Sequence, residues 1–438
     1  MAKISANDAW KKLFDKYDIV NEIEKNGFFN IKASEIKEFK EPRLMAKWDS
    51  SESLPAIFKK HNINILPTSR GSYILSDFKL YEEIPELTEH ITKMQRVEIP
   101  EFESIDIENI NSESNAINVL LLSNILDDFL NEDDSVSTFN GRMGTGKFDF
   151  FVDRTSKKPL NVFVENAQCE IDGGLENANS VVIIEAKNVV YPDFHIRQLY
   201  YPYRLWKTRV EKPIRLVFSI YSNQIFRLLE YKFNELNNYS SIQLVKEKSY
   251  SLQDTEINNN DLLKVFEKTQ VKTDDNQMNT DIPFIQANSF ERVISLLEIL
   301  QNNNETTESI AEIMQFDLRQ SDYYFNAGRY LGLFEKLDTV DELDKAIVEI
   351  RLTALGKKIA SMKYKERQLK IVELILEHKI FNEFFFGIYT TGNFPTKADI
   401  QDKMRLYNVC NEGQIVRRSG SVLAWLKWIF KLTKIEMI

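Results

Sequence analysis

Apolar residues recur at helical spacing in two early stretches of the chain. The first is amphipathic and runs through residues 9–23. The second, residues 111–131, is stronger and places five apolar side chains on one face: Ile117, Leu120, Leu121, Ile125 and Phe129. A stripe of this spacing is typical of a helix that packs one face against a core. We therefore predict a helix in each stretch.

Other apolar runs have the length and composition of strands. They lie at residues 63–67, 71–75, 148–152, 160–171, 181–187 and 214–220, and a helical pattern fills residues 194–210. The first hundred residues therefore predict a small α+β module. The order of helix, hairpin-like strands, helix and strand that follows predicts an α/β domain with a central mixed sheet.

The pattern changes again in the last third of the chain. Residues 251–281 turn polar, with the runs Asn258-Asn259-Asn260-Asp261 and Asp274-Asp275-Asn276, which is typical of a connection. Residues 287–438 are nearly all helical in pattern. We therefore divide the chain into a module at 1–100, a sheet domain at 101–250, a linker at 251–284 and a helical region at 285–438, with two tandem units as one option for the last.

Composition restricts the classes of function. The net charge of −10 would repel a polyanion, so nucleic-acid binding has to come from local basic stretches, such as 357–370 and 417–434. Such stretches are equally often solvated helix faces. Two distant cysteines and four histidines provide neither a zinc cluster nor a Ser-His-Asp site. No apolar run is long enough to span a bilayer, so we expect a soluble, cytoplasmic protein without membrane contacts.

The sharpest chemical feature joins two predicted strands. Asp172 ends one of them, and the next carries Glu185-Ala186-Lys187. Alternate side chains of a strand share a face, so Glu185 and Lys187 point the same way from an apolar strand. A buried charged pair is costly unless it is paired or holds an ion. Two carboxylates at one point suit Mg²⁺, and a lysine beside them can orient water and stabilise a phosphorane-like transition state.

A second interpretation of the same residues is structural. A glutamate and a lysine two positions apart also form ordinary pairs at a sheet edge, and aspartate is common in turns. The short pattern alone leaves both interpretations open. Glu170 shares the strand face of Asp172, as a reserve metal ligand or as a salt-bridge partner. Gln198 follows on the next predicted helix, where it contacts a phosphate, supports the site or is simply a surface residue.

The motif Asp172…Glu185-Ala186-Lys187 resembles the PD-(D/E)XK nuclease superfamily, and in particular its type II restriction endonucleases. Ser112-Glu113-Ser114 at a helix start, Asn140-Gly141-Arg142 before a strand and the segment from Gln198 to Arg204 add to the resemblance, which covers residues 110–220. One departure is Ile171, which stands where the name of the superfamily calls for proline.

The resemblance implies a function and a set of roles. Asp172 and Glu185 would bind Mg²⁺, Lys187 would be catalytic, and Glu113 would assist at the metal. The reaction would be sequence-specific hydrolysis of double-stranded DNA that leaves 5′-phosphate and 3′-hydroxyl ends. A homodimer is the natural expectation, because one site per chain has to cut two strands. A cognate DNA methyltransferase would act on the same DNA site without needing to bind the protein.

Further DNA contacts are expected outside the motif. The segment Gly141-Arg142-Met143-Gly144-Thr145-Gly146-Lys147 resembles a phosphate loop, but Phe148 stands where Ser or Thr is needed, and a strand follows rather than a helix. We instead predict a loop near DNA, with Arg142 and Lys147 on phosphates. The module at 1–100 is also expected to contact DNA.

The helical region predicts a second DNA-binding element. Residues 307–316, a short turn and a helix through Leu333, with a wing near 350–355, resemble a winged helix. Its second helix would enter the major groove and offer Arg319, Gln320, Tyr323 and Arg329. Residues 396–406 and 414–428 repeat the helical scheme with Arg417 and Arg418, and there the two tryptophans, Trp425 and Trp428, are expected in the core. A helical dimerisation domain would show a similar periodicity.

Three functions therefore follow from the sequence. The first is a type II restriction endonuclease. The second is a modification-dependent or repair nuclease with the same core, which would cut only methylated or damaged duplex. The third is a DNA-binding regulator that keeps the sheet without the chemistry.

Overall fold

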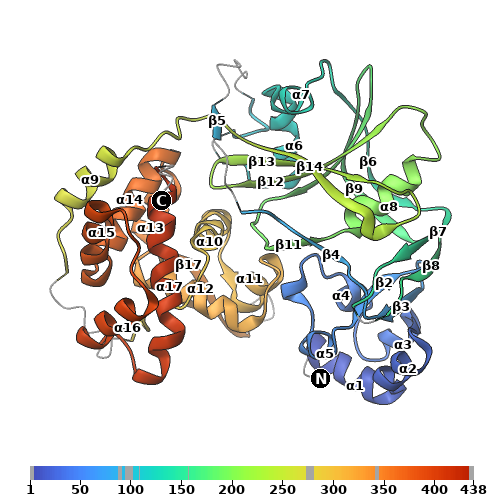
Figure 1. Ribbon diagram of the computed structural model, residues 1–438, viewed down its shortest axis with the longest axis horizontal. Helices are drawn as coiled ribbons and strands as arrows, with labels where there is room; N and C mark the ends of the chain where they lie inside the picture. The colour runs from blue at the N-terminus through green and yellow to red at the C-terminus, as the bar shows by residue number, and fades with distance from the viewer. Residues whose placement is uncertain are drawn as a thin grey trace.

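The structure is a computed structural model that describes residues 4–86, 91–93, 102–107, 109–155, 157–272, 281–340 and 345–433. Three parts are visible in Figure 1: a small N-terminal part at the lower right, a sheet-containing central part above it, and a helical C-terminal part on the left. The three parts meet around helices α10 (Phe290–Asn302) and α11 (Thr307–Ile313).

The N-terminal part wraps short helices around a three-stranded sheet. Its helices are α1 Ala6–Tyr17, α2 Ile19–Asn26, α3 Ala33–Lys37, α4 Arg43–Ala46, η1 Ser51–Ser53 and α5 Ala56–His61. Its strands are β1 Phe29–Lys32, β2 Asn64–Pro67 and β3 Ser72–Ser76, in the order β1-β3-β2. The helix predicted at 9–23 is split because Asp18 adopts a left-handed conformation at φ 48°. Fully buried Trp10 centres this small core.

The central part is built on a seven-stranded mixed sheet. Its helices are α6 Glu113–Leu122, α7 Ile125–Leu130 and α8 Arg197–Trp206, with the short η2 Tyr239–Ser241. Its strands are β4 Tyr81–Glu83, β5 Ile91–Lys93, β6 Val136–Gly144, β7 Lys147–Val152, β8 Leu160–Glu165, β9 Gln168–Glu176, β10 Val181–Lys187, β11 Asp193–His195, β12 Ile214–Ser222, β13 Ile225–Phe233 and β14 Ile242–Ser251. The predicted mixed α/β sheet is therefore confirmed.

The order of strands in the sheet is β5-β14-β13-β12-β10-β9-β6. Strands β6, β9 and β10 form an antiparallel run, and β10 pairs in parallel with β12. Alternation along β10 sends Ile183 into the core on the α8 side, whereas Val182, Ile184 and Ala186 pack with α6 and α7. Both faces of β10 are therefore buried, which explains its nearly continuous apolar sequence.

The strands β6 to β9 form one long, bent hairpin. Strand β7 pairs with β8, and β6 pairs with β9 further along the same ribbon. The bend comes at Asn166, which has φ 53°, and at Gly146, which has φ 73°. The single strand predicted at 160–171 is therefore two strands. The segment predicted as a loop is mostly strand, because Arg142 lies within β6 and Lys147 begins β7. The contacts of these two residues with phosphates stay a prediction.

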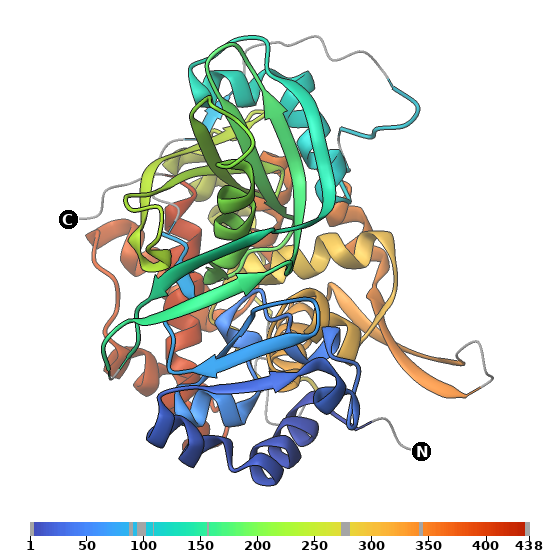
Figure 2. The ribbon, with the colours of Figure 1, turned by 90° about the vertical axis from the view of Figure 1, so that its right-hand side faces the viewer.

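The C-terminal part contains helices and one small sheet. Its helices are α10 Phe290–Asn302, α11 Thr307–Ile313, α12 Leu318–Tyr330, α13 Ala354–Ala360, α14 Tyr364–Leu376, α15 Lys379–Thr391, α16 Lys397–Leu406 and α17 Glu412–Lys431. Its strands are β15 Glu305–Thr306, β16 Phe334–Val340 and β17 Ala346–Leu352, in the order β15-β17-β16. The hairpin of β16 and β17 projects from the body of the molecule, as Figure 2 shows in orange.

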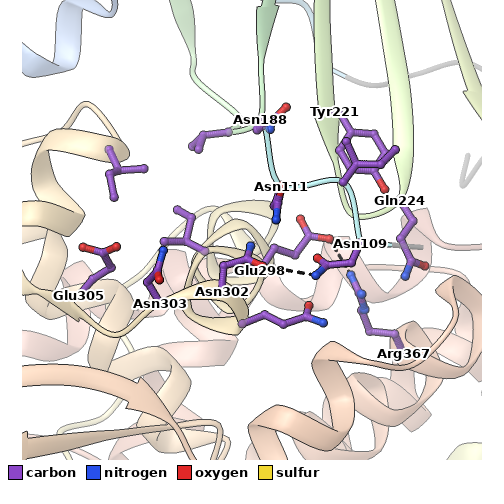
Figure 3. A pocket seen from close by; sticks show the side chains of 15 residues that line it. Asn109, Asn111, Asn188, Tyr221, Gln224, Glu298, Asn302, Asn303, Glu305 and Arg367 are labelled. Carbon is purple, nitrogen blue, oxygen red and sulfur yellow. Dashed lines mark hydrogen bonds and ion pairs between the residues drawn. The ribbon is translucent and has the colours of Figure 1, made fainter. Parts of the chain in front are cut away.

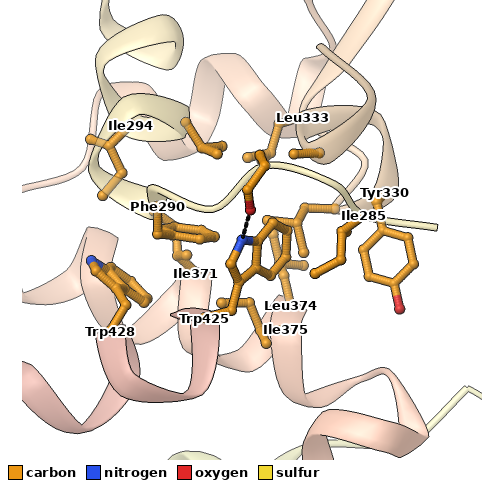
Figure 4. Packing of buried hydrophobic residues seen from close by; sticks show 14 of the residues in the cluster. Ile285, Phe290, Ile294, Tyr330, Leu333, Ile371, Leu374, Ile375, Trp425 and Trp428 are labelled. Atoms are coloured by element: carbon orange, nitrogen blue, oxygen red, sulfur yellow. Dashed lines mark hydrogen bonds between the residues drawn. The ribbon is translucent and has the colours of Figure 1, made fainter. Parts of the chain in front are cut away.

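The core of the C-terminal part gathers around α17. Trp425 is fully buried there, and its indole N–H donates to the carbonyl of Ala287 at 2.9 Å (Figure 4). Trp428 stacks at a tilt on Phe290, with ring centroids 4.2 Å apart. The expectation that both tryptophans belong to the core is confirmed. Helices α16 and α17 lie close to the two helices predicted at 396–406 and 414–428. Among the described residues, strands such as β16 and β17 follow only the first pair of helices.

Two boundaries differ from those predicted. Strands β4 and β5 lie within the first hundred residues, yet they pair with β11 and β14 of the central part. The expected linker holds α9 Asn259–Lys268, whose Phe266 stacks on Phe385 of α15. The polar segment predicted as a linker therefore contains an ordered helix with one apolar face. None of the described helices combines the length and the apolar character that crossing a bilayer would need.

Candidate active site

The pairing of β9 with β10 brings the predicted site residues together. The register ends at Ile184 opposite Gly173, so Asp172 and Glu185 are the next residues on the two strands. Beyond this point the backbone pairing of β9 with β10 ends. A side chain takes its place, because Asp172 Oδ2 accepts the backbone N–H of Ala186 at 2.9 Å. Strand β10 keeps its pairing with β12 as far as Lys187 and Ile220. The carboxylate of Asp172 therefore lies where β9 separates from β10.

Lys187 and Glu185, which flank Ala186 on β10, form a buried ion pair. Lys187 Nζ lies 2.5 Å from Glu185 Oε1 and also donates to the carbonyl of Ala186 at 3.0 Å. Gln198, in the first turn of α8, donates through Nε2 to Glu185 Oε1 at 2.5 Å. Gln198 thus supports Glu185 from within the site. Its assignment to DNA binding is not supported, because the side chain is buried against Glu185.

Glu113 approaches the site from the opposite face of the sheet. It opens α6 after the N-cap Ser112, whose hydroxyl accepts the N–H of Asn115. Glu113 Oε1 lies 3.7 Å from Lys187 Nζ, and 43% of the Glu113 side chain is exposed. Lys187 therefore lies near two carboxylates, and Glu113 is the more exposed of the two.

Burial sets the protonation of this cluster. It raises the pKa of Glu185, and the charge of Asp172 adds to the shift while Lys187 opposes it. Burial also raises the pKa of Glu113, with a further increase from Asp172 and Asp49 and a decrease from Lys187. The pKa of Lys187 is raised well above its ordinary value, because the carboxylates around it outweigh its own burial. The lysine therefore stays charged.

Asp49, which belongs to the N-terminal part, is a further charged residue at this cluster that no motif in the sequence indicates. Its charge acts on Glu113, Glu185 and Lys187, and its Oδ1 is buried without a hydrogen-bond partner. The backbone carbonyl of Asp49 accepts the N–H of His195, and its N–H donates to Gln315 Oε1 at 3.4 Å. No signal in the sequence connects Asp49 with the motif, because only the packing of two separate parts brings them together.

Contacts among the three parts surround the cluster. Ser50 and the N–H of Ser51 donate to Asp193 Oδ1, both at 2.8 Å. Glu52 pairs with Arg292 of α10 at 2.6 Å. Tyr191, four residues after Lys187, donates its hydroxyl to the carbonyl of Ile313 in α11 at 2.9 Å. The segment after the candidate catalytic strand is therefore tied to both flanking parts.

The donor set of this cluster suits Mg²⁺, although a compact ligand group is not preformed. Among the described residues, no three His, Cys, Asp or Glu side chains lie close enough together to hold a metal. Asp172 and Glu185 each present carboxylate oxygens, the ligands that Mg²⁺ prefers, and Gln198 Oε1 is buried without a partner. One oxygen of each carboxylate is engaged by Ala186 N–H or by Lys187 and Gln198, so the other oxygen is the one that fits a cation.

Three neighbouring residues have ordinary surface pairs. Glu170 lies 3.1 Å from Arg142, and both side chains are largely exposed. Lys147 pairs with Glu165 at 2.5 Å, also at the surface. Glu170 therefore has the salt-bridge role that the sequence left as its alternative. Pairs of this kind contribute little to stability, so Arg142 and Lys147 can exchange their partners for phosphates.

The C-terminal candidates divide into exposed and structural residues. Arg319 is exposed in the first turn of α12, whereas Gln320 is half-buried with Oε1 unpartnered. Arg329 lies over the ring of Phe325, and Arg417 donates to the hydroxyl of Tyr323 at 2.8 Å. Arg418 is 8% exposed and donates to the carbonyl of Phe284 at 2.8 Å. Its assignment to DNA binding is wrong in this arrangement, because the guanidinium is used inside the core.

Three domain-family profiles match consecutive parts of the chain. Residues 7–75 match a domain of unknown function (DUF6996), residues 76–251 a second (DUF6997), and residues 292–434 a third (DUF7226). Searches among curated proteins and among solved structures found no match. The cluster of Glu113, Asp172, Glu185 and Lys187 falls within the second matched region, and Asp49 falls within the first.

Proposed function

We propose that this protein is a magnesium-dependent endonuclease that cuts double-stranded DNA at a defined sequence. The observation that carries the proposal is the register of β9 and β10, which sets Asp172 beside Glu185 and the buried, charged Lys187. An isolated Glu–Lys pair at a sheet edge would be exposed. Here both residues are less than 8% exposed and further carboxylates lie near them, which is unusual for a purely structural pair.

The roles of the residues follow from their contacts. Asp172 and Glu185 would hold Mg²⁺ through the oxygens that Ala186 N–H, Lys187 and Gln198 leave available. The bound metal would supply Lewis acidity toward the scissile phosphate. Lys187 presents its ammonium to the attacking water and to the charge that develops on phosphorus. Gln198 keeps Glu185 oriented, and Glu113 holds Lys187 from the solvent side.

The C-terminal part supports a DNA substrate. Helix α10, strand β15, helices α11 and α12, and the hairpin of β16 and β17 follow one another in the order of a winged helix. In such a unit the second helix of the pair enters the major groove, and here that helix is α12, with Arg319 exposed at its start. The sequence placed the wing near 350–355, and the hairpin begins earlier, at Phe334.

The direct test is incubation of the purified full chain with several methylation-free genomes in Mg²⁺, followed by sequencing of the fragment ends. The proposal predicts discrete fragments with 5′-phosphate and 3′-hydroxyl ends. Gel-shifted but uncut DNA would instead identify a DNA-binding regulator. Cleavage restricted to methylated or damaged duplex would identify a modification-dependent or repair nuclease.

A further inference from the structure

A cavity of about 230 Å³ lies between the central and C-terminal parts. Figure 3 shows residues of the sheet-bearing part above it and residues of α10 and its neighbours below. Two of its lining residues continue the catalytic segments, since Asn188 directly follows Lys187 and Asn111 lies two positions before Glu113. The lining of the cavity is therefore continuous in sequence with the two segments that carry Lys187 and Glu113.

Amide side chains dominate the lining of this cavity. They are Asn109, Asn111, Asn188, Gln224, Gln301, Asn302 and Asn303. Two of the amide oxygens, Asn188 Oδ1 and Gln224 Oε1, are buried without a hydrogen-bond partner. Gln224 is 8% exposed and uses its Nε2 to donate to the carbonyl of Met362 at 3.2 Å. An unsatisfied buried acceptor is costly, so these oxygens indicate a ligand with N–H donors.

The charges and size of the cavity restrict the ligand. Arg367 is paired with Glu298 at 2.7 Å, and Glu305 adds a further carboxylate, so the lining does not favour a phosphate. Tyr221 adds an aromatic wall, and four aliphatic side chains complete the lining. The volume lies below the roughly 300–1,000 Å³ of sites for drug-sized molecules. A neutral, planar ring with both donors and acceptors matches this combination.

We infer that this cavity binds a nucleobase turned out of the DNA duplex beside the cut position. The inference rests on the proposed function for its substrate, and its link to the site is that Asn111 and Asn188 belong to the segments that carry Glu113 and Lys187. Asparagine and glutamine amides pair with the edges of bases, and an extruded base is read in this way together with contact to an aromatic ring. The pocket then helps to choose the sequence or the modification state that is cut.

The first test uses free nucleosides and does not depend on cleavage. Saturation-transfer NMR on the full chain with the four 2′-deoxynucleosides and 5-methyl-2′-deoxycytidine should show binding of at least one at millimolar concentration. Asn111→Ala and Asn188→Ala should weaken that binding about tenfold. Asn21→Ala, an exposed amide in α2 outside the cavity, should leave it unchanged. Absence of transfer to every nucleoside, or equal transfer with the variants, overturns the inference.

The second test uses duplexes with 2-aminopurine at each position around a mapped cut site. Binding in Ca²⁺ should raise the fluorescence at one position, and Asn188→Ala should reduce the rise. A Gln224→Met variant, checked by thermal melting, should reduce it as well. DNA that is cut without any rise in fluorescence contradicts the inference and leaves the proposed function standing. Nucleoside binding without DNA cleavage contradicts the proposed function and keeps the base-binding site.

Discussion

The charged residues of the candidate site influence one another's pKa values. Lys187 lies 2.5 Å from Glu185 and 3.7 Å from Glu113. Burial raises the pKa of both Glu113 and Glu185, and the negative charge of Asp172 and Asp49 raises it further. A site with several carboxylates and one buried ammonium repels phosphate until a cation enters. This explains why a metal ion is central to the proposed chemistry.

Asp49→Asn tests the contribution of the N-terminal part to this charge. Loss of one negative charge close to the cluster should weaken Ca²⁺ binding several-fold, measured by calorimetry in the absence of DNA. Cleavage at low Mg²⁺ should fall and should recover at saturating Mg²⁺. Asp8→Asn, an exposed change in α1, serves as the control. Unchanged Ca²⁺ affinity in Asp49→Asn would show that Asp49 only anchors the interface.

Gln198 is the residue whose role is most clearly changed by the structure. Gln198→Ala removes the amide that donates to Glu185 Oε1, so Glu185 can move toward Lys187. We expect cleavage to fall by about 10–100-fold, the cost typical of losing a partner that orients a metal ligand, with DNA affinity in Ca²⁺ nearly unchanged. A loss of DNA affinity with normal single-turnover cleavage would contradict this role and would show that Gln198 contacts DNA.

At the scale of elements, β10, which carries Glu185 and Lys187, agrees with the prediction from the sequence better than the elements around it do. Strand β10 matches its predicted bounds because residues 181–187 are apolar except for the Glu–Lys pair. The run at 160–171 was taken as one strand because the left-handed Asn166 looks like any polar residue in a strand. Helix α8 begins later than expected because β11 occupies Asp193–His195. Contacts across separate parts, such as those of Asp49, leave no local pattern to find.

Substitutions of two arginines, Arg319 and Arg418, distinguish DNA recognition from folding in the C-terminal part. Arg319→Ala removes an exposed charge from α12, so it should weaken DNA binding by about 1–3 kcal/mol or lower the salt dependence of binding by about one unit, at an unchanged melting temperature. Arg418→Ala should instead lower the melting temperature, because the carbonyl of Phe284 loses its buried donor. Equal effects of the two changes on DNA binding would contradict this division.

We expect His195 on β11, at the interface between the first two parts, to make the stability of the protein depend on pH. Burial, with Arg197 adding to it, lowers the pKa of His195 well below its ordinary value. Its Nδ1 accepts the N–H of Arg197 and faces the hydroxyl of Tyr239, and the Tyr81 ring packs beside it. The histidine is therefore neutral in the folded protein.

Protonation of the unfolded chain then lowers stability as the pH falls below the ordinary histidine pKa. The contribution of His195 is present above about pH 6.5 and is lost by up to about 1.4 kcal/mol per pH unit below it. Urea unfolding between pH 5 and 7.5 should show a shallower pH dependence for His195→Gln than for the unchanged chain. Parallel curves for the two proteins would mean that another group controls the acid response.

At the scale of the whole molecule, the site is a meeting point of three parts. Asp49 and Glu52 come from the first, the motif from the second, and Ile313, Gln315 and Arg292 from the third. The core of the C-terminal part also includes Val189 and Tyr191, which follow the catalytic strand. Removal of residues 285–438 would therefore expose the apolar neighbours of the site as well as remove α12.

A gentler change than deletion tests this coupling. Tyr191→Phe keeps the ring in place and removes only the hydrogen bond to the carbonyl of Ile313. We expect the melting temperature to fall by a few degrees and the cleavage rate to fall more than DNA affinity, because the segment after Lys187 becomes less fixed. Ala186, Glu185 and Lys187 themselves are untouched by this change. A normal cleavage rate would show that the C-terminal part positions DNA without ordering the site.

The central claim, that Lys187 is a catalytic group rather than a structural ion-pair partner, is tested most directly by Lys187→Ala. Binding of duplex DNA is measured in Ca²⁺ and single-turnover cleavage in Mg²⁺, side by side with the unchanged chain. The account predicts nearly unchanged binding and a cleavage rate lower by several orders of magnitude, because a contact to the transition state is lost. Cleavage by Lys187→Ala at the rate of the unchanged chain would contradict the account.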